Sequence, residues 1–321
     1  MTSSGNAWFV QRASGRSIAF LRRVLETRLV GTGLAVGASN QPVAFLRRVL
    51  ETRLVGTGLA ISAIVVLTAI FADVVAPYDP NMQDYNAFTE PPSIAHWLGT
   101  DDLGRDVLSR IIYGSRVSLE VGVIAVAISL TIGVGSGLLA GYAGGWTDDV
   151  IMRVVDAVQA FPGLVLALAI TAALGPGIGN AMIAIGFVTS PGIARLARGQ
   201  TLSIRERDFV SAARVLGVSP LRIMARHIWP NVTGPIVVQS TLLMANAIVT
   251  EASLSFLGVG VVPPTASWGA MLRIGSQYLE VAPWIALAPG MAIFTTVLAF
   301  NFVGDGLRRA LDPRLVARRV A

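Results

Sequence analysis

Lysine and cysteine are missing from this 321-residue chain, and charged residues of either sign are scarce. Without lysine the chain can build neither the Gly-Lys-Ser/Thr loop that cradles nucleotide phosphates nor a Schiff base. Without cysteine, disulfides, zinc-thiolate sites and thiol nucleophiles are excluded. Charged residues make up 14% of the chain, against about a quarter in soluble domains, and hydrophobic residues make up 53%. The composition therefore argues against a water-soluble protein.

What the chain has instead is long hydrophobic runs. A helix needs about 20 apolar residues to cross a hydrocarbon core of about 30 Å. Six stretches approach this length: residues 54–76, 117–140, 154–174, 178–194, 236–259 and 283–303. We therefore expect an all-α polytopic membrane protein with about six transmembrane helices.

The arginines are distributed unequally around these stretches. Twenty of the 25 lie before the first stretch, between the fourth and fifth, or after the sixth. Cytoplasmic loops of membrane proteins are enriched in basic residues. We therefore expect a multi-pass protein of the cell membrane with both termini in the cytoplasm. Topology accounts for the net charge of +6, so nucleic acid is not needed as a partner.

The N-terminal segment contains a perfect internal duplication. Residues 19–35 recur unchanged as residues 44–60. Old structural repeats keep a pattern but not their identity, so we interpret this as a recent duplication or a cloning artefact. Only the second copy continues into a run long enough to span a bilayer.

The resulting layout has five parts. They are a cytoplasmic segment 1–53, a first transmembrane helix 54–76, an external loop 77–116 with a short helix at 103–113, a transmembrane core 117–306 that includes a cytoplasmic loop 199–232, and a cytoplasmic tail 307–321.

The cytoplasmic loop favours two short helices around a glycine turn. A capping box at Ser203 predicts the start of the first helix, and Gly217 fits the position just beyond its end. Ser219 is typical of a new helix start, and we expect Pro230 to end that helix. One face of the first helix gathers Phe209, Ala212, Ala213 and Leu216.

Three interpretations of this two-helix knob are open. It could dock in a groove on a partner protein, as amphipathic helices do. It could be a solvated loop whose arginines only enforce orientation. It also resembles superficially a helix-turn-helix DNA reader, although its position between membrane spans disfavours that interpretation.

Several motifs, in a shared order and spacing, resemble one known family. In the loop, the matching positions are Ser211, Ala212, Ala213, Gly217, Ile228 and Pro230, with Ser211 in place of the usual glutamate. Elsewhere they are residues 96–101, 103–107, 160–163, 251–258 and 267–271. From about residue 44 onward the chain resembles permease subunits of binding-protein-dependent ABC importers, most closely the second, C-type subunit of dipeptide and oligopeptide importers.

This resemblance implies an ABC importer type I permease fold that forms half of a translocation pathway for peptides in a bacterial plasma membrane. The implied partners are a second homologous permease subunit, two ATPase subunits or domains that hold ATP and Mg, and an external solute-binding protein. The chain itself would carry no cofactor and no ATPase site. The implied ATPase-docking residues are Glu206, Phe209, Ser211, Ala212, Ala213, Leu216, Gly217, Ile228 and Pro230.

Polar residues inside membrane spans are functional candidates, because burying them in lipid is costly. Asn246 and Glu251 are candidates for the translocation path, although Glu251 could instead hold the outer end of its helix against the following loop. For Asp156 we expect an ion pair with Arg153, three residues earlier.

Other features have plainer interpretations. Gly133, Gly137, Gly141 and Gly145 are spaced for close helix packing, and Pro162 predicts a kink. No motif for catalysis or metal binding is found. The competing functional class is a self-contained membrane channel or a membrane-embedded enzyme.

Overall fold

The computed structural model describes residues 53–311, and the predictions for residues 1–52 and 312–321 lie outside them. Within the described range the regular structure is helical, with no strand and one isolated bridge between Thr100 and Asp106. The all-α prediction is confirmed. In chain order the elements are α3 Arg53–Ile70, α4 Ala72–Val75, α5 Val107–Ala143, α6 Gly145–Gln159, α7 Gly163–Leu174, α8 Ile178–Arg205, α9 Asp208–Val215, α10 Pro220–Ile223, the π-helical turn η1 Met224–Ile228, α11 Trp229–Phe256, α12 Trp268–Gly275 and α13 Trp284–Leu311.

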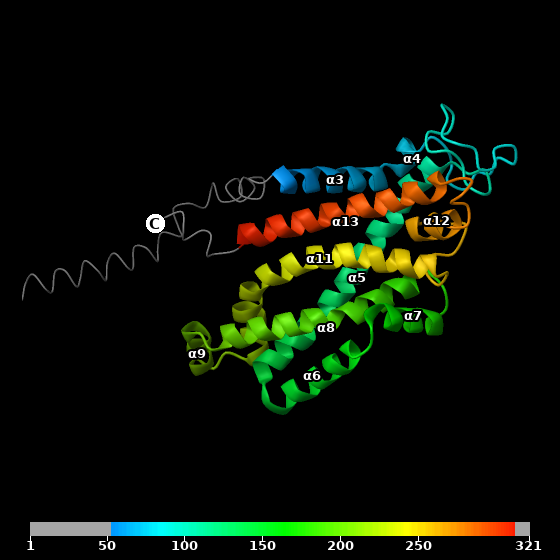
Figure 1. Ribbon diagram of the computed structural model, residues 1–321. Coiled ribbons are helices and arrows are strands. Elements are labelled where there is room, and N and C mark those ends of the chain that lie inside the picture. Colours follow the sequence, from blue (N-terminus) through cyan, green and yellow to red (C-terminus); the bar gives the residue numbers. More distant parts are fainter. Residues whose placement is uncertain (1–52, 312–321) are drawn as a thin grey trace, which may run out of the picture. The chain divides into compact units, whose positions relative to one another are not determined.

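The long helices form one bundle (Figure 1). α8 packs along α5, α11 packs against α13 and α5, and α3 packs against α13. By length and apolar composition, α5, the stretch Pro220–Phe256 and α13 can cross a membrane, and the bent pair of α6 and α7 makes a fourth candidate. The two remaining stretches expected from the sequence form α3 and α8 of the same bundle.

The third hydrophobic run is broken rather than kinked. α6 and α7 meet at an angle of 89°, and Pro162 is the residue that precedes α7. Proline donates no backbone hydrogen bond and disfavours helical geometry at the residue before it. The expected single helix over 154–174 is therefore replaced by two, and the first begins as early as Gly145.

Glycines let α5 and α8 approach closely. A Cβ at Gly133 would lie 2.6 Å from the carbonyl oxygen of Ser190, and one at Gly141 would lie 2.7 Å from Cβ of Thr201. Gly137 meets the same helix between them. The packing prediction is thus confirmed for these three glycines. Gly145 differs: nothing lies within 4 Å of a Cβ there, and its φ of +52° belongs to the turn into α6.

The external loop leads directly into α5. The side chain of Asp106 caps this helix by accepting a bond from the Ser109 amide at 2.7 Å. The expected separate helix at 103–113 is wrong: the helix begins at Val107 and continues without a break into the hydrophobic run, since no proline interrupts it and Gly114 is accommodated within α5. The loop is fixed by a buried ion pair between Asp101 and Arg105 at 2.7 Å.

Candidate docking and translocation sites

The knob between α8 and α11 contains the predicted glycine turn. α9 ends in a Schellman motif: the amide of Val218 donates to the carbonyl of Ala213 at 3.1 Å, and Gly217 donates to Arg214 at 3.0 Å. Gly217 has a φ of +73°, which glycine adopts without strain. The predicted start of the first helix is wrong, because Ser203 is still inside α8 and Arg207 precedes α9.

The second half of the knob is continuous with the bundle. Ser219 precedes α10 and Pro220 begins it, as expected. Pro230 does not end a helix; it stands in the first turn of α11, where a missing amide hydrogen costs least. One π-helical turn joins α10 to α11. The knob therefore includes α9 and α10, and α10 is continuous with α11 through this turn.

The knob has an inner and an outer face. On the inner face, Val210, Ala213, Ile223 and Ile228 are buried in one cluster with side chains from α5, α8 and α11. On the outer face Val215 is 88%, Leu216 81% and Leu221 74% exposed.

The docking residues expected from the sequence divide between these faces. Ala213 and Ile228 are buried, so the expected single face of Phe209, Ala212, Ala213 and Leu216 is wrong for Ala213. The exposed members are Glu206, Phe209, Ser211, Ala212, Leu216, Gly217 and Pro230. Val215 and Leu221 were missed, although both are large apolar residues beside the glycine turn.

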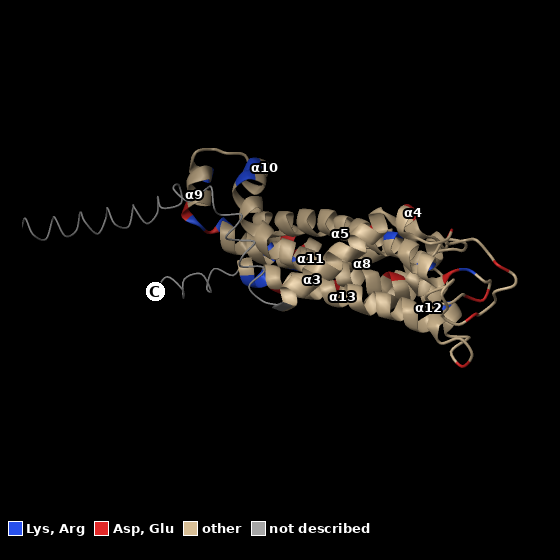
Figure 2. Cartoon of the chain, turned by 90° about the horizontal axis from the view of Figure 1, so that it is seen from above, with Lys and Arg blue, Asp and Glu red and all other residues tan. Residues whose placement is uncertain are grey.

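Arginines attach the knob to the end of α5. Arg205 donates to the carbonyl oxygen of Gly141 at 2.8 Å and also pairs with Glu206 at 2.9 Å. The guanidinium of Arg214 lies 5.5 Å from the ring centroid of Tyr142. Figure 2 shows basic residues gathered at the α9 and α10 end, and several acidic residues in the loops at the α12 end.

A polar pocket of about 240 Å³ lies between α7, α8 and α11. Its polar side chains are Thr189, Asn246 and Thr250. Asn246 is exposed, and its side-chain amide has no hydrogen-bond partner within residues 53–311, whereas its backbone carbonyl accepts a bond from Thr250. An unpaired amide facing lipid would be costly, so this face is suited to water or protein.

The pocket continues toward the α12 end as a second hollow of about 400 Å³ beside α11. Ser253 and Leu257 line it, and they continue the face of α11 that carries Asn246 and Thr250. The two hollows share Leu164 of α7. Together they form a groove along α11, lined by uncharged residues.

Glu251 lies outside this groove. Its side chain is fully buried, and one carboxylate oxygen accepts a bond from the Ser255 hydroxyl at 2.7 Å. That hydroxyl also accepts a bond from the amide of Val261, in the loop after α11, at 3.0 Å. This arrangement matches the alternative in which Glu251 holds the outer end of its helix.

Asp156 pairs with a distant arginine rather than a local one. Arg195 of α8 lies 2.6 Å from it, so the expected partner Arg153 is wrong. A second pair joins α6 to α8, with Arg198 donating twice to Asp148 at 2.5 and 2.6 Å. Since Asp156 and Arg195 are largely exposed, their pair contributes little to stability.

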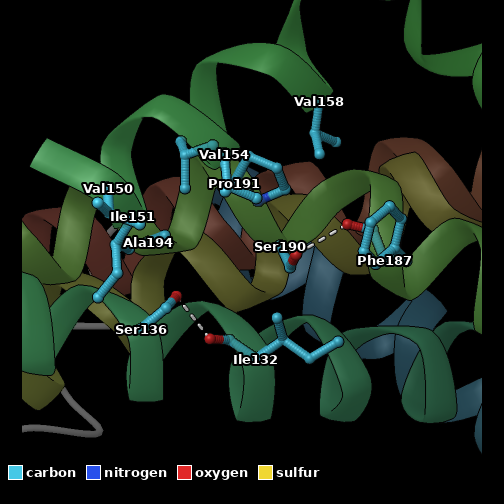
Figure 3. A pocket seen from close by; sticks show the side chains of 11 residues that line it. Ile132, Ser136, Val150, Ile151, Val154, Val158, Phe187, Ser190, Pro191 and Ala194 are labelled. Carbon is cyan, nitrogen blue, oxygen red and sulfur yellow. Dashed lines mark hydrogen bonds between the residues drawn. The ribbon is translucent and has the colours of Figure 1, made fainter. Parts of the chain in front are cut away.

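Between these ion pairs lies an apolar hollow of about 250 Å³, lined by α5, α6 and α8 (Figure 3). The Ser190 hydroxyl donates to the carbonyl oxygen of Phe187 at 2.8 Å, the oxygen that loses its usual donor because residue 191 is proline. Ser136 donates to Ile132 at 2.7 Å. The hollow thus offers no free donor. Among residues 53–311, no cluster of His, Asp and Glu side chains could hold a metal ion.

Comparisons with known proteins decide the family. Residues 133–317 match the family described as "Binding-protein-dependent transport system inner membrane component". The chain belongs to this family of permeases. Residues 44–92 match the "N-terminal TM domain of oligopeptide transport permease C". The transport function expected from the sequence is therefore confirmed at the level of a peptide-type ABC importer permease subunit.

Relatives and a solved structure agree with this assignment. The permease is 46% identical over 253 residues to "Glutathione transport system permease protein GsiD" of Pectobacterium atrosepticum and to the protein of the same name in Escherichia coli. The match covers 78% of this chain and 84% of each relative. It shares its fold with the inward-facing MetNI methionine ABC transporter, with a TM-score of 0.52 and 17% identity, covering 63% of this chain and 96% of that one. The family match contains both the knob and the groove of this permease.

Proposed function

We propose that this permease imports short peptides, the size of di- to oligopeptides and including glutathione, through a pathway of which it forms half. The substrate class is supported by relatives named for glutathione transport and by the match to an oligopeptide permease segment. The groove of α7, α8 and α11 is the half-pathway, because it carries the unpaired side-chain amide of Asn246 together with Thr189 and Thr250 inside an apolar bundle.

The outer face of the knob is the seat for a cytoplasmic ATPase. The observation that carries this proposal is the two-sided construction of the knob. Val215, Leu216 and Leu221 are exposed together, while the opposite face is packed against the ends of α5, α8 and α11. An exposed apolar patch on a short helix is typical of a docking site. A partner bound to this patch would move α5, α8 and α11 together, because the knob packs against all three helices.

The arginines at the α9 end of the bundle support an orientation of the permease in the membrane, and this orientation sets the side on which each partner would bind. The α9 end carries most of the described arginines and belongs in the cytoplasm, with both chain termini. A second homologous permease would supply the other wall of the pathway. Two ATPase subunits would hold ATP and Mg, and an external solute-binding protein would deliver peptide at the α12 end.

The mechanism is then a shift between two populations of one bundle. ATP binding brings the two ATPases together and pulls both knobs. Since α10 continues into α11 through η1, the pull is transmitted along the wall that carries Asn246. Inward-open and outward-open states alternate around the pathway as the knob moves.

Gly217→Val tests the docking role. A β-branched residue resists the positive φ of the turn, so the knob would be misplaced while the spans remain intact. We expect ATP-dependent glutathione or dipeptide uptake by proteoliposomes of the assembled importer to fall at least tenfold at unchanged membrane level. Gly217→Asn, which tolerates this geometry, should keep most of the uptake. Full uptake by the valine variant would contradict the docking role.

The absence of cysteine from the chain gives a direct test of orientation. A single cysteine in place of exposed Ser211 should react with a membrane-impermeant maleimide in inside-out vesicles and not in intact cells. Labelling from the cell exterior would reverse the topology and remove the basis for ATPase docking.

A further inference from the structure

The pocket at Asn246 offers a ligand mainly hydrogen-bond acceptors, because of the bonds that its side chains already make. Asn246 lies ten residues before the end of α11, which corresponds to about 15 Å at 1.5 Å per residue. This is about half of the hydrocarbon core, so a substrate at this level has lost bulk water and must find partners in the wall.

The hydroxyl hydrogens of the two threonines of the pocket are already used in bonds within their own helices. Thr189 donates to the carbonyl oxygen of Ile185 at 2.8 Å, and Thr250 donates to that of Asn246 at 2.8 Å. A hydroxyl has one hydrogen and two lone pairs. Toward the pocket both threonines can therefore only accept hydrogen bonds. The amide of Asn246 adds a third acceptor and one donor group.

No charged side chain lines the pocket. Glu251, the next residue after Thr250, is buried with its carboxylate on the Ser255 hydroxyl. A ligand group is thus selected here by hydrogen bonding rather than by an opposite charge.

We propose that this pocket is the subsite for the N–H donors of the peptide, its terminal ammonium group and the adjacent amide N–H. An ammonium group has three donors and no acceptor, and an ionised carboxylate has acceptors only. Three neutral oxygens can replace the hydration of the former, as carbonyl oxygens do for cations in channel filters. For the latter the pocket offers only the single donor group of Asn246, and the three oxygens repel it. The carboxyl end of the peptide must then be held elsewhere in the assembly. This inference rests on the proposed peptide function.

The test compares peptides that differ only at the amino end. Uptake of trialanine, N-acetyl-trialanine and trialanine amide is measured in proteoliposomes of the assembled importer supplied with ATP. The double variant Thr189→Val and Thr250→Val removes both acceptors at nearly constant shape. Thr295→Val is the matched control, because its hydroxyl makes the same bond within α13, to Met291 at 2.7 Å, outside the pocket.

We expect the unmodified importer to prefer trialanine over its N-acetyl form. The double variant should lose about thirtyfold in trialanine uptake, since each of its two lost bonds contributes about 1 kcal/mol and about 1.4 kcal/mol corresponds to a factor of ten. It should also lose the preference. The control should keep both, and amidation of the carboxyl end should have the same effect on all three proteins. Equal loss for trialanine and the N-acetyl form, or no loss, would overturn the subsite while leaving peptide import intact. If the unmodified importer takes up no peptide, the proposed function fails as well.

A second measurement does not depend on transport by the double variant. Asn246→Cys places the sole thiol of this chain in the pocket. Trialanine should slow its alkylation in the assembled importer, and N-acetyl-trialanine should not. Equal protection by the two peptides, or protection by neither, would overturn the assignment.

Discussion

The guanidinium of Arg214 lies over the ring of Tyr142, with its central carbon 5.5 Å from the ring centroid. Arg214 belongs to α9 and Tyr142 to the last turn of α5, 72 positions earlier in the chain. The contact therefore joins the knob to the helix that packs along α8. A force applied to α9 reaches α5 through this contact as well as through the apolar cluster beneath it.

Removing this contact should weaken coupling without unfolding the bundle. A cation–π contact at an exposed site contributes about 0.5–1 kcal/mol. For Tyr142→Leu we expect ATP-dependent uptake to fall about two- to fivefold, with membrane level unchanged. Tyr142→Phe keeps the ring and should retain full uptake. If both variants transport equally, the contact has no part in coupling.

The close packing of α5 on α8 allows a paired test of stability. A Cβ at Gly137 would overlap the carbonyl oxygen of Ala194 and lie 2.7 Å from Cβ of Ala197, whereas nothing lies within 4 Å of one at Gly135. Overpacking costs about 1–3 kcal/mol. We expect Gly137→Ala to lower the thermal midpoint of the detergent-solubilised protein by several degrees and Gly135→Ala to leave it unchanged or raise it. Equal thermal midpoints of the two variants would show that α8 shifts to accommodate the added methyl group at residue 137.

Local chemistry predicted the turn of the knob, while tertiary contacts decided which of its sides is buried. Gly217 and Ser219 could be predicted because the turn and cap preferences of these residue types act locally. The capping box at Ser203 failed because the longer helix α8 continues through it. Which apolar residues of α9 and α10 stay exposed depends on the cluster around Ile223 and Val232, which no periodicity within these two short helices reveals. Val215 and Leu221 were missed for that reason.

The same division applies to the polar groups inside the bundle. Asn246 was identified because an amide in an apolar run is conspicuous in sequence. Thr189, 57 positions earlier, became part of its pocket only through the packing of α8 against α11. Asp156 was assigned the nearest arginine, but its partner Arg195 comes from the helix that returns alongside α6. Sequence spacing identifies neighbours on one helix and cannot identify those on the next.

Asp102 in the external loop should make stability depend on pH. Burial raises its pKa above the ordinary value, and the neighbouring Asp101 adds to the shift. A carboxyl whose pKa is higher in the folded state favours folding when protonated, and this contribution is lost as the pH rises through the folded pKa. At pH 7 the ionised group therefore weakens the fold.

Asp102→Asn should accordingly raise the thermal midpoint at pH 7 by a few degrees. The gain should shrink as the pH approaches about 4, the ordinary pKa of aspartate, because the natural side chain is then protonated as well. Exposed Asp79, which only accepts a bond from the Asn81 amide at 2.7 Å, provides the control Asp79→Asn. A gain that is constant across this pH range would show that ionisation of Asp102 is not its cause.

The duplicated N-terminal stretch leads to a prediction about α3. Residues of the second copy form packing contacts between α3 and α13. Val55 is fully buried and stands against Gly306, and a Cβ at Gly58 would lie 2.7 Å from Cβ of Phe302. Gly58→Leu should therefore reduce the amount of protein in the membrane.

Deleting residues 19–43 removes one 25-residue unit and leaves a single copy that continues into the apolar part of α3. Since the first copy is followed by Gly37, Ser39, Asn40 and Pro42 rather than by an apolar run, it cannot complete a span, and α3 needs only the second. We expect the deletion to leave membrane level and ATP-dependent uptake unchanged. A deleted protein that inserts normally but no longer transports would assign the first copy a role of its own at the cytoplasmic face.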